Sequence, residues 1–409
     1  MISQQPLHGI RVVDLTRVLA GPYCTMILKN LGAEIIKVEA PTGDDSRQFG
    51  PFIDGKPEKS AYFYSINCGK KSVALDLKTD GGKEILADLI RKTDVLFENF
   101  RPGTLARLGF SKEHIRELNP DIIDASASGF GQTGPDSKKA AYDSIVQALS
   151  GIISITGTEA GEMVRVGTSI SDIITGCYSA IGILAALFRR EKGGAGASLD
   201  IAMLDSTVSA LENAIARYQV SGESPTPLGS RHPSITPFET FKTRDGEIMI
   251  AAGNDKLFAA LCEVINNPGL AEDYRFASNL ARTENFKSLR EAINSVMVTE
   301  TAAHWLEKLT VRKIPCGRIN TIEDLFQDKQ LDARNMLTPI QGEESFKIAG
   351  NPVKFTGEED PIEAEAPPQL GEHNSEILKM LLGYSDQKIT ELLRGKVLFE
   401  HIQPGQANP

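Results

Sequence analysis

The chain has 409 residues, of which 41% are hydrophobic and 24% charged, and its formal net charge is −10 at pH 7. These values are ordinary for a soluble globular protein, and the length exceeds that of one compact core, so two domains are expected. Nucleic acids and anionic membranes are bound by broad basic faces, and the acidic balance argues against either partner.

The five cysteines are scattered without a C-x-x-C pair, and the six histidines are isolated. This pattern favours a reducing compartment and argues against a disulfide framework and against a metal site. The first residues, MISQQPLHGIRVVDL, contain no basic segment that leads into a long apolar run, which argues against a secretory signal. A cytoplasmic location is expected, with an organelle matrix as the alternative.

Short β-branched runs alternate with amphipathic segments in the first half of the chain. Residues 9–15 predict a strand, residues 21–32 a helix and residues 33–38 a second strand. This spacing is typical of a βαβ unit, whose strands pair in parallel. Residues 1–205 are therefore expected to form a large α/β domain with a doubly wound, Rossmann-like sheet. The further predicted elements are strands at 72–77, 94–98, 122–126 and 197–203, and helices at 80–91, 102–108 and 112–118.

After a predicted helix at 204–220, the chain becomes rich in proline, glycine and serine, so residues 206–235 are interpreted as a linker. A small α+β domain is expected over 236–330, beginning with a hairpin whose Arg-Asp-Gly turn lies at 244–246. The helices predicted for this domain are 256–264, 286–297 and 301–311.

Residues 331–409 are expected to leave the small domain and return to the large one. The segment 358–368 is rich in Glu, Pro and Ala, which predicts an extended crossing without a core of its own. Two helices, 374–382 and 386–393, are predicted to complete the return.

The most apolar helix, predicted from residue 173 to residue 188, follows Asp172. An aspartate at a helix start often caps the backbone. A carboxylate at the positive end of a helix, beside apolar walls, also suits a nucleophile that attacks an activated acyl group. Both roles are open for Asp172 on this segment alone. The uncharged run is shorter than the roughly 20 residues of a membrane span, so a core helix is predicted.

Two glycine motifs lack the context of the chemistry that they suggest. Residues 129–134 match G-x-G-x-x-G, but the loop continues where a dinucleotide site requires a helix. Residues 167–171 approach the G-x-S-x-G elbow of hydrolases without its second glycine. Basic or small residues at the ends of predicted strands instead suggest a crevice for a phosphorylated ligand, although each lysine alone is more often a solvated charge. They lie at 17–22 after the first strand, at Lys70, Lys71 and Lys78 around the strand 72–77, and at 99–103 with Arg107 after the strand 94–98.

Six segments, in order along nearly the whole chain, resemble the class III coenzyme A transferases, the formyl-CoA and carnitine-CoA transferase family. They are LTRVLAGPYCTMILKNLGAEIIKVE, NCGKKSVALDLKTDGGKE, ENFRPGTLARLGF, GFGQTGP, the region around Asp172, and LGEHNSEIL. The resemblance implies a large domain built from both chain ends, a smaller domain between linkers, and a homodimer of interlocked rings. It also implies that acyl-CoA and a carboxylic acid are substrates, with no tightly bound cofactor or metal.

Within this resemblance, Asp172 matches the catalytic aspartate. The family's glycine-rich loop over the active site is represented by residues 251–255, and basic positions of some members are Ala40 and Ala140 here. The positions that match the family's coenzyme A contacts are Val18, Leu19, Ala20, Leu75, Lys78, Asn99, Phe100, Arg107 and Met203.

The expected chemistry needs no general base, because an aspartate of ordinary pKa, about 3.9, is ionised at pH 7. Asp172 is expected to attack the donor acyl-CoA and form a mixed anhydride, which the released thiolate converts to an aspartyl-CoA thioester. The acceptor carboxylate then attacks that thioester, and the thiolate takes the new acyl group. Succinyl-CoA and a small dicarboxylic acid are the favoured donor and acceptor, because the GND sequence at 253–255 resembles the members of the family that use succinyl-CoA more than those that use oxalate.

Backbone N–H groups near Gly131, Gly134 or Gly253 are candidates for stabilising the oxyanions. The arginines that are candidates for binding the acceptor carboxylate are Arg17, Arg47, Arg165 and Arg231.

Two rival functions are open. An α-methylacyl-CoA racemase resembles the same fold, but the relatives that racemise carry a histidine where this chain has Tyr142, next to Asp143. A phenol with a pKa of about 10 is a poor proton shuttle near neutrality. A non-catalytic CoA-binding protein is the second rival, and the intact acid at Asp172 argues against it.

Overall fold

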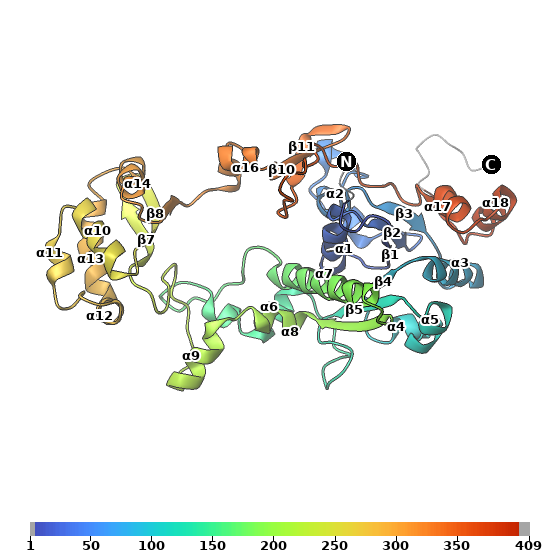
Figure 1. The fold of residues 1–409 in the computed structure, drawn as a ribbon, viewed down its shortest axis with the longest axis horizontal. Helices are drawn as coiled ribbons and strands as arrows, with labels where there is room; N and C mark the ends of the chain where they lie inside the picture. The colour runs from blue at the N-terminus through green and yellow to red at the C-terminus, as the bar shows by residue number, and fades with distance from the viewer. Residues whose placement is uncertain (1–4, 401–409) are drawn as a thin grey trace. The chain divides into compact units, whose positions relative to one another are not determined.

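The computed structural model describes residues 5–400, which form two compact units (Figure 1). The first unit contains the described residues up to Ile152, then Val166–Ala216, and the described residues from Lys329 onwards. The second contains Ile153–Arg165 and Arg217–Asp328. Both chain ends therefore contribute to the first unit.

A six-stranded parallel sheet lies at the centre of the first unit, with the order β3-β2-β1-β4-β5-β6. The strands are β1 (Arg11–Asp14), β2 (Glu34–Glu39), β3 (Lys71–Ala74), β4 (Val95–Glu98), β5 (Ile123–Ser128) and β6 (Ala197–Ala202). The chain winds outward from β1 to β3 and then outward from β4 to β6 on the other side. This order confirms the predicted doubly wound α/β sheet, and its direction reverses between β1 and β4.

Alternate side chains of the sheet enter two hydrophobic cores, one on each face. Val13 packs in a core with residues of α3, α5, α17 and α18, whereas its neighbour Val12 packs with residues of α1 and α7. Successive strand residues point to opposite faces, which explains why runs of Val and Ile form these strands. The helices are α1 (Ala20–Asn30), α3 (Asp80–Lys92), α5 (Lys112–Leu118), α7 (Ile170–Glu191), α17 (Asn374–Met380) and α18 (Asp386–Arg394).

Among the described residues, helix α7 has the length and the apolar composition that a membrane-spanning helix needs. In this structure Ala180, Ile183 and Leu187 of α7 are buried against the sheet. The helix is thus part of the protein core, as its sequence predicts.

Several elements differ from the sequence prediction. The helix predicted at 204–220 is divided into α8 (Met203–Ser209) and α9 (Asn213–Ser221), with Glu212 between them at φ 55°. That left-handed conformation cannot continue an α-helix. The predicted helix at 102–108 is present as the shorter α4 (Thr104–Arg107). Elements of the first unit that the prediction missed are α2 (Ala61–Asn67), α6 (Asp143–Ser150), α16 (Lys329–Ala333) and the hairpin of β10 (Leu337–Ile340) and β11 (Glu343–Ala349).

The second unit is built on the antiparallel sheet of β7 (Phe238–Thr243), β8 (Gly246–Ala251) and β9 (Cys316–Arg318). The predicted hairpin is confirmed by the pairing of β7 with β8. Its helices are α10 (Asp255–Val264), α11 (Gly269–Glu272), α12 (Asn279–Glu284), α13 (Phe286–Met297), α14 (Ala302–Val311) and α15 (Ile322–Leu325). Trp305, Ile293 and Phe241 are among the side chains buried in its core.

Candidate active site

The nine positions matched to coenzyme A contacts all follow the carboxyl ends of parallel strands. Leu75 and Lys78 follow β3, and Met203 follows β6. The segment 18–20 follows β1, and Asn99, Phe100 and Arg107 follow β4. Because parallel strands end at the same edge, the fold gathers these loops along one edge of the sheet, where open α/β sheets bind ligands. They differ in exposure: Leu75, Ala20 and Met203 are buried, whereas Lys78 and Arg107 are exposed.

The loop between β1 and α1 lies at the point where the strand order reverses. Val18 has φ 67°, a left-handed conformation that β-branched residues rarely adopt. Its N–H donates to Asp44 Oδ1 at 3.1 Å. Asn99, from the loop after β4, accepts the Arg17 N–H at 2.9 Å and donates to the Arg17 carbonyl oxygen at 2.8 Å. Two neighbouring segments therefore hold this strained loop in place.

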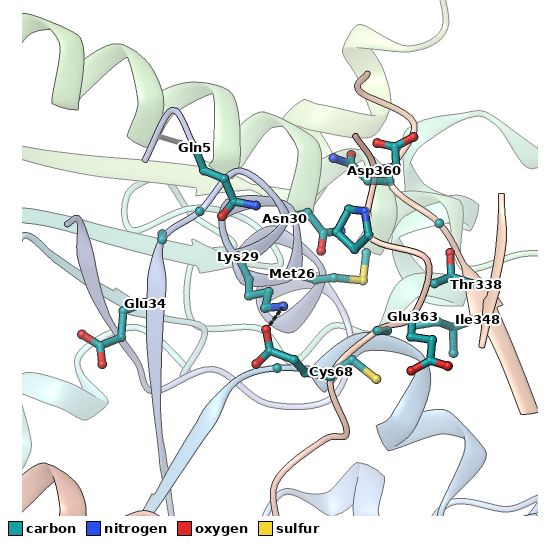
Figure 2. A pocket seen from close by; sticks show the side chains of 18 of the residues that line it. Gln5, Met26, Lys29, Asn30, Glu34, Cys68, Thr338, Ile348, Asp360 and Glu363 are labelled. Carbon is teal, nitrogen blue, oxygen red and sulfur yellow. Dashed lines mark hydrogen bonds and ion pairs between the residues drawn. The ribbon is translucent and has the colours of Figure 1, made fainter. Parts of the chain in front are cut away.

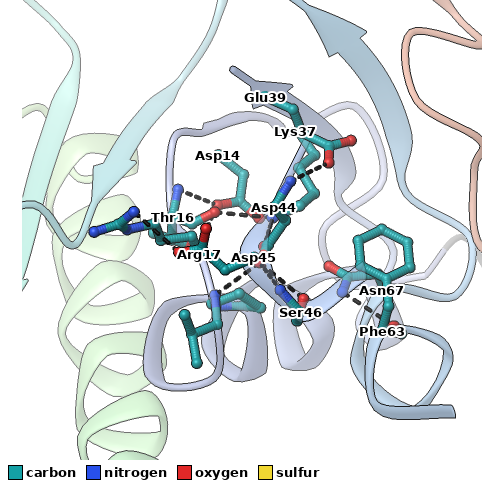
Figure 3. A network of polar contacts seen from close by, with 12 residues as sticks. Asp14, Thr16, Arg17, Lys37, Glu39, Asp44, Asp45, Ser46, Phe63 and Asn67 are labelled. Carbon is teal, nitrogen blue, oxygen red and sulfur yellow. Dashed lines mark hydrogen bonds and ion pairs between the residues drawn. The ribbon is translucent and has the colours of Figure 1, made fainter. Parts of the chain in front are cut away.

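A buried ionic network lies beneath the same loop (Figure 3). Lys37 donates to the Thr16 carbonyl oxygen at 2.8 Å and pairs with Asp44 Oδ2 at 2.8 Å. Asp14 accepts the Thr16 N–H at 2.9 Å and the Thr25 hydroxyl at 2.6 Å. Burial disfavours the charged form of Lys37, but the carboxylates of Asp44 and Asp14 raise its pKa, so the lysine is charged. The buried pair of Lys37 and Asp44 therefore helps to fix the position of the loop between β1 and α1.

The lysines at 70 and 71 do not belong to the ligand crevice, contrary to the sequence interpretation. Lys70 is buried, and its Nζ donates to Asn67 Oδ1 at 2.9 Å and to the Pro22 carbonyl oxygen at 3.0 Å. Burial lowers the pKa of Lys70 to about 8. Lys71 pairs with Glu34 and Glu376, each at 2.7 Å. The Lys70 ammonium also pairs with Asp14 Oδ2 at 3.5 Å, so it belongs to the buried network beneath the loop after β1. Both lysines are therefore occupied by protein partners.

Asp172 lies in the first turn of α7, beside the start of α1. Gly176 is one turn further along, on the same face of the helix. A Cβ at position 176 would lie 2.8 Å from the Ala20 carbonyl oxygen and 3.0 Å from Tyr23 Cδ1. Only glycine allows the two helices to approach so closely. This contact brings the turn that carries Asp172 against the helix that begins at Ala20.

The Asp172 carboxylate is mostly buried and has an altered acidity. Among the residues that the structure describes, none forms a hydrogen bond or ion pair with it, so the capping role is not supported. Burial, and then the negative charge of Asp143, raise the pKa of Asp172 to about 7. The ordinary pKa expected from the sequence is therefore wrong for this group. Poor hydration is the physical cause, and it also favours nucleophilic attack.

Tyr62 is a further ionisable group near Asp172 that the sequence interpretation missed. Burial, and then the charge of Asp172, raise the pKa of Tyr62 to about 12, so its hydroxyl is protonated at neutral pH. Its ring packs edge-on against Phe49, with centroids 5.5 Å apart. The short helix α2 that carries Tyr62 has no strong periodic signal, which explains the omission.

The four candidate arginines for the acceptor carboxylate have different surroundings. Arg47 binds Glu39 through two hydrogen bonds of 2.7 and 2.8 Å and stacks on Phe63, so it already has a carboxylate partner. Arg17 pairs with Asp45 at 3.0 Å on the surface, next to the loop described above. Arg165 and Arg231 belong to the second unit.

The glycine turns proposed for oxyanion binding are also divided between the units. Gly131 and Gly134 have φ 82° and 87° in the loop after β5, and Asp200 accepts the Gln132 N–H at 2.9 Å. Gly253 is in the second unit, where its carbonyl oxygen accepts a hydrogen bond of 3.0 Å from the buried Arg282. These contacts fix the turns but assign no N–H group to an oxyanion.

A cavity of about 580 Å³ lies at the opposite, amino edge of the sheet (Figure 2). Arg11, Glu34 and Lys71, the first residues of β1, β2 and β3, line it. Its charges neutralise one another: Arg11 pairs with Glu34 at 2.9 Å, and Lys29 pairs with Glu365 at 3.1 Å. No group of three or more potential metal ligands occurs within residues 5–400. This cavity is therefore separate from the edge that carries Asp172.

Comparisons with known proteins agree with this geometry. A sequence model of CoA-transferase family III matches residues 7–374. Acetyl-CoA:oxalate CoA-transferase from Acetobacter aceti is 43% identical, over 91% of this chain and 95% of that protein. Succinate–glutarate CoA-transferase from Agrobacterium fabrum is 40% identical, over 92% of this chain and 96% of that protein. The crystal structure of a CAIB/BAIF family protein from Brucella suis superposes with a TM-score of 0.82 at 37% identity, covering 93% of this chain and all of that one.

Proposed function

The chain belongs to CoA-transferase family III, and from this premise we propose that it moves CoA from succinyl-CoA to a small dicarboxylic acid through covalent intermediates on Asp172. Family membership makes it an enzyme of acyl-CoA metabolism whose substrates are CoA thioesters and carboxylates. The observation that carries the proposal is a poorly hydrated carboxylate at the start of α7, beside the beginning of α1, to which residues 5–400 offer no hydrogen bond or ion pair.

The proposed reaction keeps the energy of the thioester. Ionised Asp172 attacks the thioester carbonyl of the donor, the C–S bond breaks, and an aspartyl anhydride and CoA thiolate form. The thiolate attacks the aspartyl carbonyl, which releases the donor acid and leaves an aspartyl-CoA thioester. The acceptor carboxylate attacks this thioester and frees the thiolate, which then takes the acceptor acyl group and restores Asp172. Water would hydrolyse either anhydride, so a dry site is required.

The substrate proposal rests on the relatives and on the sequence at 253–255. One relative is named for succinate and glutarate and another for oxalate, and all three are small dicarboxylic acids. A dicarboxylic acceptor presents a second carboxylate that an arginine binds in two-pronged fashion. Arg17, next to the strained loop of Val18, is the favoured arginine of the first unit: its pair with Asp45 is exposed to water and can be exchanged for a substrate carboxylate, whereas the pair of Arg47 with Glu39 is buried.

The first unit is the proposed CoA-binding domain, and the nine matched positions are its proposed contacts. Its carboxyl edge carries Lys78 and Arg107 as exposed cations, which suits the phosphates of CoA. A cytoplasmic homodimer of interlocked chains is also proposed. Supporting the homodimer, α6 and α7 expose apolar side chains that a soluble monomer rarely leaves to water. These are Ile145, Leu149, Tyr178, Ile181 and Phe188.

The racemase alternative requires a proton shuttle that Tyr142 does not supply. Its side chain is 75% exposed, so the phenol lies in water in this chain and not in an enclosed pocket beside a reacting carbon. The transferase is therefore the better supported function.

Trapping of the intermediate tests the proposal. Succinyl-CoA is added to the purified enzyme, hydroxylamine is added after a short delay, and the Asp172 peptide is analysed by mass spectrometry. We expect a hydroxamate at Asp172, no hydroxamate in Asp172→Asn, and transfer of CoA to at least one dicarboxylic acid in a panel of acceptors. Full exchange activity in Asp172→Asn contradicts the mechanism. Deuterium exchange at the α-carbon of an acyl-CoA, without trapping, indicates the racemase.

A further inference from the structure

Asp143 and Gln147 lie one turn apart on α6 and are both buried. Asp143 Oδ1 accepts the Ser171 N–H at 2.9 Å, and Asp143 Oδ2 accepts a hydrogen bond of 2.7 Å from Gln147 Nε2. Gln147 Oε1 accepts the Val166 N–H at 2.9 Å. The two side chains therefore hold both ends of the segment that leads to Asp172.

This arrangement supplies an acceptor that α7 lacks locally. The first N–H groups of a helix have no partner within the helix, and a side chain of the N-cap residue commonly provides one. Ser169 occupies the N-cap of α7 but makes no such side-chain bond. Asp143 provides the acceptor from α6, so the Asp172 carboxylate is not consumed as a cap.

We propose that Asp143 and Gln147 are positioning residues for the nucleophile, a role that rests on the function proposed above for Asp172. Asp143 fixes the backbone of Ser171, and this sets the direction in which the next side chain leaves the helix. Gln147 holds the second oxygen of Asp143 and, through Val166, the entry to the turn. Neither side chain contacts the reacting atoms.

Asp143 has an electrostatic effect in addition to its geometric one. The ionisable groups around the start of α7 are Asp143 from α6, Tyr62 from α2, Tyr23 from α1 and Cys177 from α7 itself. The negative charge of Asp143 opposes ionisation of Asp172. The same carboxylate that orients the nucleophile therefore also moves its titration toward neutral pH.

A charge swap separates these effects. Asp143→Ala removes both bonds of Asp143. The double variant Asp143→Asn with Gln147→Glu can retain all three: Asn Oδ1 accepts from Ser171, Asn Nδ2 donates to Glu, and the other Glu oxygen accepts from Val166. Formation of the aspartyl-CoA adduct from succinyl-CoA is measured in a single turnover, together with the Kd for CoA. The pH is varied over about 1.5 units on either side of the pKa of Asp172, which is about 7.

We expect Asp143→Ala to slow adduct formation at least about tenfold while the Kd for CoA changes less than about twofold, because the transition state and not ligand binding is affected. The swap is expected to return the rate at high pH to within about threefold of wild type. Its acid limb should move away from that of wild type, because the charge that opposes ionisation of Asp172 leaves position 143. The matched control is Asp94→Asn, whose carboxylate likewise accepts one backbone N–H, of Arg11 at 2.9 Å, and one side-chain N–H, of Arg190 at 2.7 Å, at the opposite edge.

The outcomes are distinguishable. A wild-type rate and pH profile in Asp143→Ala, or a swap variant as slow as Asp143→Ala, overturns the positioning role even where wild type forms the adduct. If Asp143→Ala does not fold, the folded swap variant decides through its rate alone. Wild-type enzyme that forms no adduct at Asp172 contradicts the proposed function itself, and the positioning role with it.

Discussion

At the scale of single residues, the proposed chemistry depends on the buried carboxylate of Asp172. The described residues give this carboxylate no hydrogen bond, whereas Asp14 at the end of β1 and Asp44 in the loop after β2 accept several. A carboxylate rich in bonds is stabilised in its charged form and is a poor nucleophile. Burial without such bonds raises the pKa of Asp172, and the raised pKa predicts a measurable effect of pH on stability.

Asp172→Asn should stabilise the protein more at pH 8 than at pH 5. The folded-state pKa, about 7, is above the ordinary 3.8, so the folded protein holds a proton that the unfolded chain releases, and stability falls as pH rises from about 4 to 7. The variant removes this penalty. The full shift in the pKa of Asp172 corresponds to about 4 kcal/mol. Because the side chain is partly exposed, we expect the variant to gain only about 1–2 kcal/mol in free energy of unfolding at pH 8.

Thermal unfolding of both proteins at the two pH values measures this difference. Asp94→Asn, which alters a carboxylate at the other edge of the sheet, controls for a general effect of charge. An equal gain at pH 5 and pH 8 would show that burial does not raise the pKa of Asp172.

At the scale of elements, the site depends on the contact between α1 and α7. α1 begins directly after the strained loop of Val18, and Gly176 lets α7 approach the first carbonyl of that helix. A change in this contact therefore moves the loop and the turn of Asp172 relative to each other. The second glycine of α7, Gly182, has no such neighbour, because a Cβ there would meet only Leu199 Cδ1 at 3.5 Å.

Substitution of the two glycines by alanine should therefore change the stability of the protein in opposite directions. Gly182→Ala should stabilise the protein by about 0.5–1 kcal/mol, because alanine loses less entropy in a helix. Gly176→Ala should destabilise it by about 1–3 kcal/mol, since a methyl group would overlap the Ala20 carbonyl oxygen, and should raise the KM for acyl-CoA. Denaturant unfolding and steady-state kinetics test both. A Gly176→Ala protein as stable as Gly182→Ala contradicts the close approach.

At the scale of the whole molecule, the first unit contains both the N-terminal and the C-terminal parts of residues 5–400, and the second unit is formed largely by the residues between. This connectivity suits the proposed interlocked homodimer, in which two such chains pass through one another. Threaded chains separate only when one of them unfolds, so their association differs from that of ordinary docked subunits.

Subunit exchange tests the threading. Two preparations with different affinity tags are mixed in native buffer at nanomolar concentration, and mixed dimers are sought by sequential capture. We expect none after a day, and a statistical proportion after joint unfolding and refolding. Mixed dimers without denaturant contradict threading, and a monomer in light scattering contradicts the homodimer.

The doubly wound α/β sheet was open to prediction from local sequence, and Asp172 was open to prediction as a candidate acid whose catalytic role the family resemblance implies. Alternating β-branched runs and helical periods predicted the βαβ units, and a lone acid before the apolar helix drew attention to Asp172. Lys70, Tyr62 and the Asp143–Gln147 pair were misjudged or missed. Their roles come from contacts across many residues, such as Lys70 with Pro22, which no local pattern encodes.

The doubly wound sheet follows from the sequence alone, because its predicted strands and helices carry the spacing of apolar residues locally. The acidity of Asp172 follows only from the folded structure. It depends on desolvation and on the charge of Asp143, which is carried by a different helix, and such effects arise from distance in space and not from position along the chain.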